Sequence, residues 1–101
     1  MGASDVTAEG PGAAAVARTL DAVVEGMGLE ATVAVSSGPE DTDIEATVDG
    51  EGLSALIGRG GETIDALQYL LGQIASRAEG GSRRRVSLDA DGYVFIVDRI
   101  K

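Results

Sequence analysis

The stretch of sequence that decides the fold covers residues 53–78 and reads LSALIGRGGETIDALQYLLGQIASRA. Its first five residues predict a short helix. Apolar residues then recur every three or four positions, which predicts a second helix from residue 62 to about residue 78. The apolar positions of this second helix are Ile64, Leu67, Leu71, Ile74 and Ala78. Between the two helices lies a four-residue turn, made of Gly58, Arg59, Gly60 and Gly61.

The composition of this turn suits the binding of an anion. One glycine is enough to end a helix, so three glycines point to a purpose beyond chain reversal. Backbone N–H groups and the positive end of the helix dipole attract a phosphate, and missing side chains let it come close. Arg59 would add a charge-assisted contact. The alternative is a chance pair of glycines in a chain that has 15 of them; its place between two helical patterns favours a ligand-binding loop.

Upstream of this stretch, the sequence predicts one helix and two strands. The helix runs from residue 13 to about residue 26 or 28, with an apolar stripe made of Val16, Leu20, Val23 and Met27. Alternating patterns then predict two antiparallel strands, each with one buried face. The buried residues are Ala31, Val33 and Val35 in the first strand and Ile44, Ala46 and Val48 in the second.

Downstream, residues 86–88 predict a third strand, and residues 93–97 are rich in residues that favour strands. The element order is therefore α-β-β-α-α-β. This order predicts an α+β protein of two layers, with the helices on one face of a three-stranded sheet. Residues 1–12 have almost nothing to bury and are expected to form a disordered lead-in.

Length and composition limit the functions open to the chain. Its 101 residues have room for one domain, and with 3% aromatic residues the core must consist of Ala, Val, Leu and Ile. The chain has no Cys and no His. This excludes disulfides, zinc sites of the Cys/His kind, and catalysis by a thiol or an imidazole. We expect no enzyme activity, no metal and no cofactor. A cytoplasmic setting is the simplest interpretation, and no apolar run reaches the roughly 20 residues of a membrane span.

The charge is divided unequally along the chain. Residues 1–52 carry eleven acidic residues and one basic residue, whereas residues 53–101 carry six acidic and seven basic residues. The net charge of −9 is therefore concentrated in the first half. An acidic protein is a poor partner for nucleic acid, because phosphate contacts supply most of the non-specific affinity. The unequal division nevertheless leaves room for one basic face in the second half.

The decisive stretch resembles the signature of a KH domain. The resemblance rests on residues 56–70, LIGRGGETIDALQYL, and on residues 85–93, RVSLDADGY. Among KH domains, these residues most resemble the KH domain of the bacterial Jag (SpoIIIJ-associated, KhpB) proteins. The element order agrees with the type II KH arrangement. The resemblance covers about residues 13–93, which gives a KH domain followed by a tail, residues 94–101, of uncertain structure. Full-length Jag proteins continue into a further nucleic-acid-binding domain, whereas this chain reads VFIV at residues 94–97.

The resemblance implies that the chain binds single-stranded RNA, with single-stranded DNA as a second candidate. A KH domain clamps about four nucleotides with its Gly-x-x-Gly loop. Carried over to this sequence, the clamp is Gly58, Arg59, Gly60 and Gly61. An apolar floor for the bases would consist of Leu56, Ile57 and Ile64, and residues 44–48 would form the opposite wall. A purely structural role is the stronger interpretation for these apolar residues. Jag proteins are linked to cell elongation, division and small-RNA networks.

The run Arg83, Arg84 and Arg85 is the second basic candidate. In an alternating strand Arg83 and Arg85 share one face, whereas Arg84 shares the other with Val86 and Leu88. Arg83 and Arg85 would extend the path of the RNA. For this run we favour a simpler interpretation, a solvated loop whose charges keep the edge of the sheet from aggregating.

A second class of function stays open, a module for protein–protein interaction. KH domains also pair through their sheets or helices, and residues 93–97 could form the edge of a homodimer or of a pair with another small KH protein.

The sequence departs from the family pattern at Gly60, where relatives often have a second basic residue. With a single arginine in the loop, phosphate should be bound less well, which weakens the RNA hypothesis.

Overall fold

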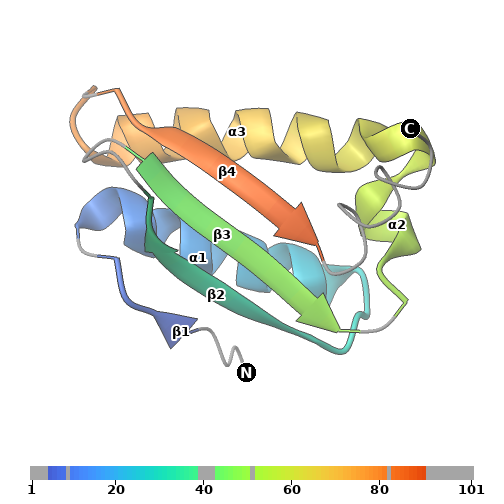
Figure 1. The fold of residues 1–101 in the computed structure, drawn as a ribbon. Helices are drawn as coiled ribbons and strands as arrows, with labels where there is room; N and C mark the ends of the chain where they lie inside the picture. Colours follow the sequence, from blue (N-terminus) through green and yellow to red (C-terminus); the bar gives the residue numbers. More distant parts are fainter. Residues whose placement is uncertain (1–4, 9, 39–42, 51, 82, 91–101) are drawn as a thin grey trace.

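The computed structural model describes residues 5–8, 10–38, 43–50, 52–81 and 83–90. Its main elements follow the predicted order: α1 (Pro11–Gly26), β2 (Ala31–Ser37), β3 (Asp43–Gly50), α2 (Ser54–Ile57), α3 (Glu62–Ala78) and β4 (Arg85–Ala90). A one-turn 3-10 helix, η1 (Arg59–Gly61), links α2 to α3. Figure 1 shows α1 and α3 side by side on one face of the sheet, so the two-layer α+β architecture is confirmed.

The sheet has the strand order β1-β2-β3-β4, in which β1 (Asp5–Val6) is a two-residue edge strand. β2 and β3 are antiparallel, as predicted, with Val33 opposite Val48. β4 runs parallel to β3, with Ala46 opposite Leu88. A parallel neighbour needs a crossover connection, and α2 and α3 provide it. The three long strands are those that the sequence predicts.

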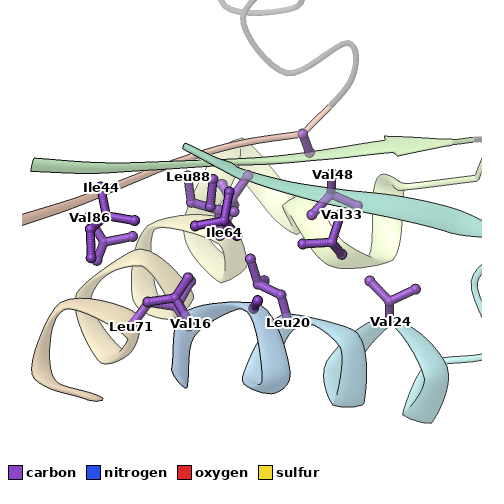
Figure 2. Close-up of a cluster of buried hydrophobic side chains, with 14 of the residues drawn as sticks. Val16, Leu20, Val24, Val33, Ile44, Val48, Ile64, Leu71, Val86 and Leu88 are labelled. Carbon is purple, nitrogen blue, oxygen red and sulfur yellow. The ribbon is translucent and has the colours of Figure 1, made fainter. Parts of the chain in front are cut away.

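The core lies between the sheet and the two long helices and is entirely aliphatic among the described residues. Alternation along each strand sends one set of side chains inward, including Val33, Ile44, Val48 and Leu88. Figure 2 shows these residues facing Val16, Leu20 and Val24 of α1 and Ile64 and Leu71 of α3. The predicted core of Ala, Val, Leu and Ile is confirmed for the described part of the chain.

Two details of the predicted helix stripes are wrong. On α1, Val24 is buried and Met27 is 41% exposed, because the helix ends at Gly26 and Met27 lies beyond it. On α3, the buried position near the C-terminus is Ala75, whereas Ala78 is exposed. In both cases the spacing of the apolar residues is compatible with two neighbouring faces of the helix, and packing in the core buries one of these faces.

The lead-in expected over residues 1–12 differs from the structure at two places. Asp5 and Val6 pair with β2 as the parallel strand β1, and the N–H of Thr7 donates to the carbonyl of Val35 at 2.8 Å. In addition, α1 already begins at Pro11. Proline is favoured at the first position of a helix because its φ is already helical and the N–H it lacks would have no partner there.

The position of β4 changes the expected binding geometry. β3 lies inside the sheet between β2 and β4, so residues 44–48 cannot form the wall of a groove beside the helices. β4 is the edge strand and lies along α3 (Figure 1). The two are tied together by the Leu88 N–H, which donates to Oε1 of Gln68 at 2.8 Å. The strand-prone residues 93–97 and the tail, residues 94–101, lie outside the described residues.

Candidate nucleic-acid interface

The turn between α2 and α3 is built from positive backbone φ angles. Gly58, Gly60 and Gly61 have φ values of 77°, 62° and 82°. Residues with a Cβ rarely adopt such angles. A Cβ on Gly58 would also collide with the side chain of Thr63. The positive φ angles therefore give the three glycines a conformational role as well, which is strictest at Gly58, whereas Gly60 lies in the left-handed region with open space around it.

Some backbone N–H groups of the turn donate hydrogen bonds within the chain, and others do not. The Gly58 N–H donates to the carbonyl of Ser54 at 2.8 Å, and the Gly61 N–H donates to the carbonyl of Gly58 at 3.3 Å. The Glu62 N–H bonds to the carbonyl of Arg59. Within the described part of the chain, the N–H groups of Arg59 and Gly60 donate to no backbone acceptor in the turns and caps. As far as the described residues go, two neighbouring donors therefore remain for an external acceptor.

The same two residues lie open to solvent. Arg59 and Gly60 are exposed, and no heavy atom would lie within 4 Å of a Cβ on Gly60. Gly61, in contrast, is buried. An anion can therefore approach the turn closely at Gly60, and the exposed side chain of Arg59 lies next to this position in the chain.

Acidic residues follow immediately after the turn. Glu62 and Asp65 occupy the first turn of α3, and both are exposed. Carboxylates at this position stabilise the helix through its dipole. They also offset part of the positive potential that a phosphate would experience at the turn, so the site combines open donors with a modest local field.

The apolar residues expected to form a floor for bases belong to the core. Leu56 and Ile64 are 0% and 1% exposed, which leaves them no surface to offer. Ile57 is 9% exposed and lies at the margin of the core. In this conformation Leu56 and Ile64 pack inward, as the structural alternative holds, and their role as a floor for bases stays a prediction.

A groove lies along α3 on the side that faces the edge strand β4. Its volume is about 330 Å³. Asp65, Gln68, Tyr69, Gly72, Gln73 and Ser76 of α3 form one wall, and Arg83, Arg84, Arg85 and Val86 form the other. The wall of α3 shows the spacing of one helix face. Of the predicted basic residues, Arg83 and Arg85 are both exposed at the rim, whereas the turn residues 58–61 do not line this groove.

Tyr69 is the residue of this groove that the sequence reasoning missed. It is 68% exposed, the most exposed of the large apolar side chains among the described residues. Its helical spacing from Asp65 and Gly72 was a usable signal, since all three fall on one face of α3. What the spacing does not give is which face lies beside the arginines.

Arg84 differs from its neighbours because it is part of the packing. Its guanidinium lies 3.4 Å from Oε2 of Glu79, and both side chains are largely buried. The same Glu79 oxygen accepts a hydrogen bond of 2.8 Å from the N–H of Gly12, at the start of α1. The Arg84 N–H donates to Oγ of Ser76. Arg84 and Glu79 thus join α1, α3 and β4, and the charge of Arg84 is paired within the fold.

No helix among the described residues combines the length and apolar character needed to cross a membrane. In the same parts of the chain, no group of three or more His, Cys, Asp or Glu residues could hold a metal ion.

Comparison with known proteins agrees with the fold and with the place of the turn. The family model described as "KhpA/KhpB, KH domain" matches residues 13–88. A curated relative, RNA-binding protein KhpB from Clostridium symbiosum, is 27% identical over 74 residues, which is 73% of this chain. The match spans 33% of that relative's own length. The matched range contains the complete turn, the groove, the whole of α3 and α1 from residue 13 onward, and the chain belongs to the KhpA/KhpB family of KH domains.

Proposed function

We propose that this chain binds single-stranded RNA by holding its phosphate backbone at the turn of residues 58–61. The observation that carries the proposal is the pair of open N–H donors at Arg59 and Gly60, on an exposed turn that opens a helix. A phosphodiester oxygen would accept from these donors, and the Arg59 guanidinium would pair with the same phosphate.

Family membership supports this assignment, since the matching relative is named an RNA-binding protein. KH domains use this kind of loop to clamp a backbone of about four nucleotides. We further propose that the chain acts in the cytoplasm, in the cell elongation, division and small-RNA networks to which the resemblance points.

The charges set the expected strength of binding. One arginine in the turn, followed by Glu62 and Asp65, gives weaker phosphate attraction than a turn with two basic residues would. Because the N–H donors carry no sequence information, discrimination between RNA sequences should be modest. We therefore expect micromolar affinity that falls as salt is added.

The test is the double variant Arg59→Asp with Gly60→Asp, measured by fluorescence anisotropy with a labelled ten-nucleotide oligouridylate. Two carboxylates at the phosphate position should reduce affinity at least a hundredfold, because like charges repel at close range. The matched control is Arg59→Asn with Gly60→Asn. Asn has the shape of Asp and tolerates the left-handed conformation of Gly60 equally well, but it adds no negative charge.

The control should retain measurable binding, and both variants should melt close to the parent because both positions are exposed. Unchanged affinity in the Asp variant would remove the turn from the RNA site. Equal loss in the Asp and Asn variants would mean that the shape of the turn, and not its charge, governs binding.

A second candidate function is self-association through α3. Leu70 is 53% exposed next to Tyr69, and it lines a small hollow with Gln73, Ile74 and Arg77. Exposed apolar residues that lie together can mark a protein interface. Sedimentation over a concentration series separates the two functions: a dimer that Leu70→Gln converts to monomers favours this candidate, and a parent that stays monomeric at all concentrations counts against it.

A further inference from the structure

We propose that the open face of the sheet excludes RNA by its charge, so that a bound strand is confined to the side that α1 and α3 cover. The residues that carry this exclusion are Glu45 and Asp49 of β3 and Asp89 of β4, and together they are called the acidic face. The inference deepens the proposed function and rests on it in one respect, namely that RNA is the ligand.

The face of the sheet that points away from α1 and α3 is covered by no other described element (Figure 1). Alternation along each strand sends every second residue toward it. These outward residues are Thr32, Ala34 and Ser36 of β2, Asp43, Glu45, Thr47 and Asp49 of β3, and Arg85, Ser87 and Asp89 of β4. One class of RNA-binding domain stacks bases on the open face of a four-stranded sheet, so this face is a potential competitor of the turn.

The open face lacks the features that such a platform uses. None of the outward residues of β2, β3 and β4 is aromatic, so bases have no ring on which to stack. The one basic residue on the outward side of these strands, Arg85, lies opposite Asp43 in the register. The residues of the acidic face lie opposite serine or threonine and are exposed. The face therefore repels a phosphate backbone in addition to offering it no partner.

The three carboxylates are close enough to act together. Thr47 lies opposite Asp89 in the register, and Glu45 and Asp49 lie two residues to either side of Thr47. With about 5 Å between strands and about 7 Å for two residues along a strand, the backbone of Asp89 lies roughly 8 Å from each of the other two. Because the Debye length is about 10 Å at 0.1 M salt, their repulsions add. A strand that approaches Thr47 therefore meets three negative charges at once.

This arrangement gives a role to part of the acidic first half of the chain. Glu45 and Asp49 belong to that half, in which the net charge of −9 is concentrated. Folding places them on the face of the sheet opposite to α3, the helix that begins directly after residues 58–61 (Figure 1). An approaching strand is therefore repelled from the sheet and directed toward the layer that holds the open donors of the turn.

The experiment places a photo-crosslinker in the middle of the acidic face. The chain has no Cys, so Thr47→Cys provides a single attachment point for benzophenone maleimide. Ala66→Cys, at an exposed position of α3 shortly after the turn, is the reference on the helical side. Each labelled protein is irradiated with a ten-nucleotide oligouridylate at low salt, and the crosslinked RNA is measured on denaturing gels. The yield at position 47 should be below about a tenth of the yield at position 66.

Removing the charge should open the face to RNA. Glu45→Gln with Asp49→Asn should raise the yield at position 47 about threefold, and Glu45→Lys with Asp49→Lys should raise it about tenfold, because attraction then replaces repulsion. The matched control, Glu62→Gln with Asp65→Asn, removes the same two charges from the first turn of α3. It should leave the yield at position 47 as in the parent. Melting curves check that all labelled variants fold.

Two results would overturn the inference. Equal yields at positions 47 and 66 in the parent would show that RNA contacts the sheet despite its charge. A yield at position 47 that changes in neither the Gln/Asn nor the Lys variant would show that charge does not exclude RNA from this face.

The proposed function is judged separately, by the anisotropy of Arg59→Asp with Gly60→Asp. If that variant binds RNA normally, the turn is not the binding site, and the yields at position 47 still decide whether the acidic face excludes RNA. If that variant loses binding while the yields at position 47 contradict the expectation, the turn stands and the exclusion fails. A parent that binds no RNA at all would overturn both.

Discussion

The two long helices of this molecule both start in glycine-rich sequence, but the backbone N–H groups at the two starts have different hydrogen-bond partners. α1 begins at Gly10, Pro11 and Gly12, and α3 begins after Gly58 to Gly61; neither start has a capping side chain of its own. At α1, the N–H of Gly12 donates to a carboxylate oxygen of Glu79, 67 residues away in the chain. At α3, the N–H groups of Arg59 and Gly60 have no backbone acceptor among the described residues.

This difference separates a structural use of a helix start from a binding use. Both starts offer donors and the positive end of a dipole to an oxygen anion. The glycines of α1 leave space for the carboxylate, since a Cβ on Gly12 would lie 2.8 Å from Oε2 of Glu79. The first start therefore stabilises the fold with an anion from the same chain. The second stays open on the surface, where an anion from another molecule can reach it.

The largest effect is expected from a Cβ at Gly58. Gly58→Ala must adopt a φ of 77° with a ψ of 177°, a region almost confined to glycine, and must displace Thr63. We expect a loss of about 3 kcal/mol in the free energy of unfolding. Gly60→Ala, with open space around it, should lose about 1 kcal/mol. Chemical denaturation measures both, and equal losses at the two positions would contradict the geometry described for the turn.

The next effect concerns the filled helix start. Glu79→Ala removes the acceptor of the Gly12 N–H and the partner of Arg84, both partly buried. The loss should be about 2 kcal/mol, typical of hydrogen bonds to a charged group, or roughly 10 °C in melting temperature. Glu79→Gln keeps an acceptor oxygen and should lose less. RNA affinity should not fall in either variant, and a drop in affinity would show that the two helix starts are not independent.

A smaller effect is expected at the open start. Arg59→Gln removes one charge-assisted phosphate contact and keeps both N–H donors. Affinity for a ten-nucleotide oligouridylate should fall about fivefold, and the salt slope should become shallower by about 0.7. Arg18→Gln serves as the control for net charge. If Arg18→Gln and Arg59→Gln behave alike, the arginine of the turn contributes only to the general field of the protein.

The smallest effect is a gain. Glu62→Gln with Asp65→Asn removes two carboxylates from the first turn of α3, so affinity for RNA should rise about threefold at low salt. The gain should disappear in high salt, because exposed charges are screened. The control pair, Glu45→Gln with Asp49→Asn, lies on the exposed side of β3, so it should give a smaller gain. Equal gains would indicate that net charge alone is responsible.

The local pattern of the sequence predicted the parts of this fold that depend on near neighbours. The break between α2 and α3 is predictable because the glycines interrupt a clear helical spacing. The buried faces of β2 and β3 are predictable because alternation in a strand allows one inward set. The two-residue strand β1 was missed, since a pattern of two residues carries no period and its pairing with β2 is set by contacts distant in sequence.

The candidate site was predictable to a lesser degree for the same reason. Composition and spacing identify the residues of the turn, and the resemblance supplies their role. The open state of the Arg59 and Gly60 donors depends on which carbonyls the other N–H groups reach. The groove depends on strand order, because only the edge position of β4 brings Arg83 and Arg85 to the face of α3 that carries Tyr69. No local pattern contains that arrangement.

The most direct test is a titration of the nitrogen-15-labelled protein with oligouridylate, followed residue by residue in amide NMR spectra. The account predicts that the Arg59 and Gly60 signals shift most and saturate with the dissociation constant measured by anisotropy, while the Gly12 signal, whose N–H is already bound by Glu79, stays in place. Signals of Arg59 and Gly60 that do not move at saturating RNA would contradict the account.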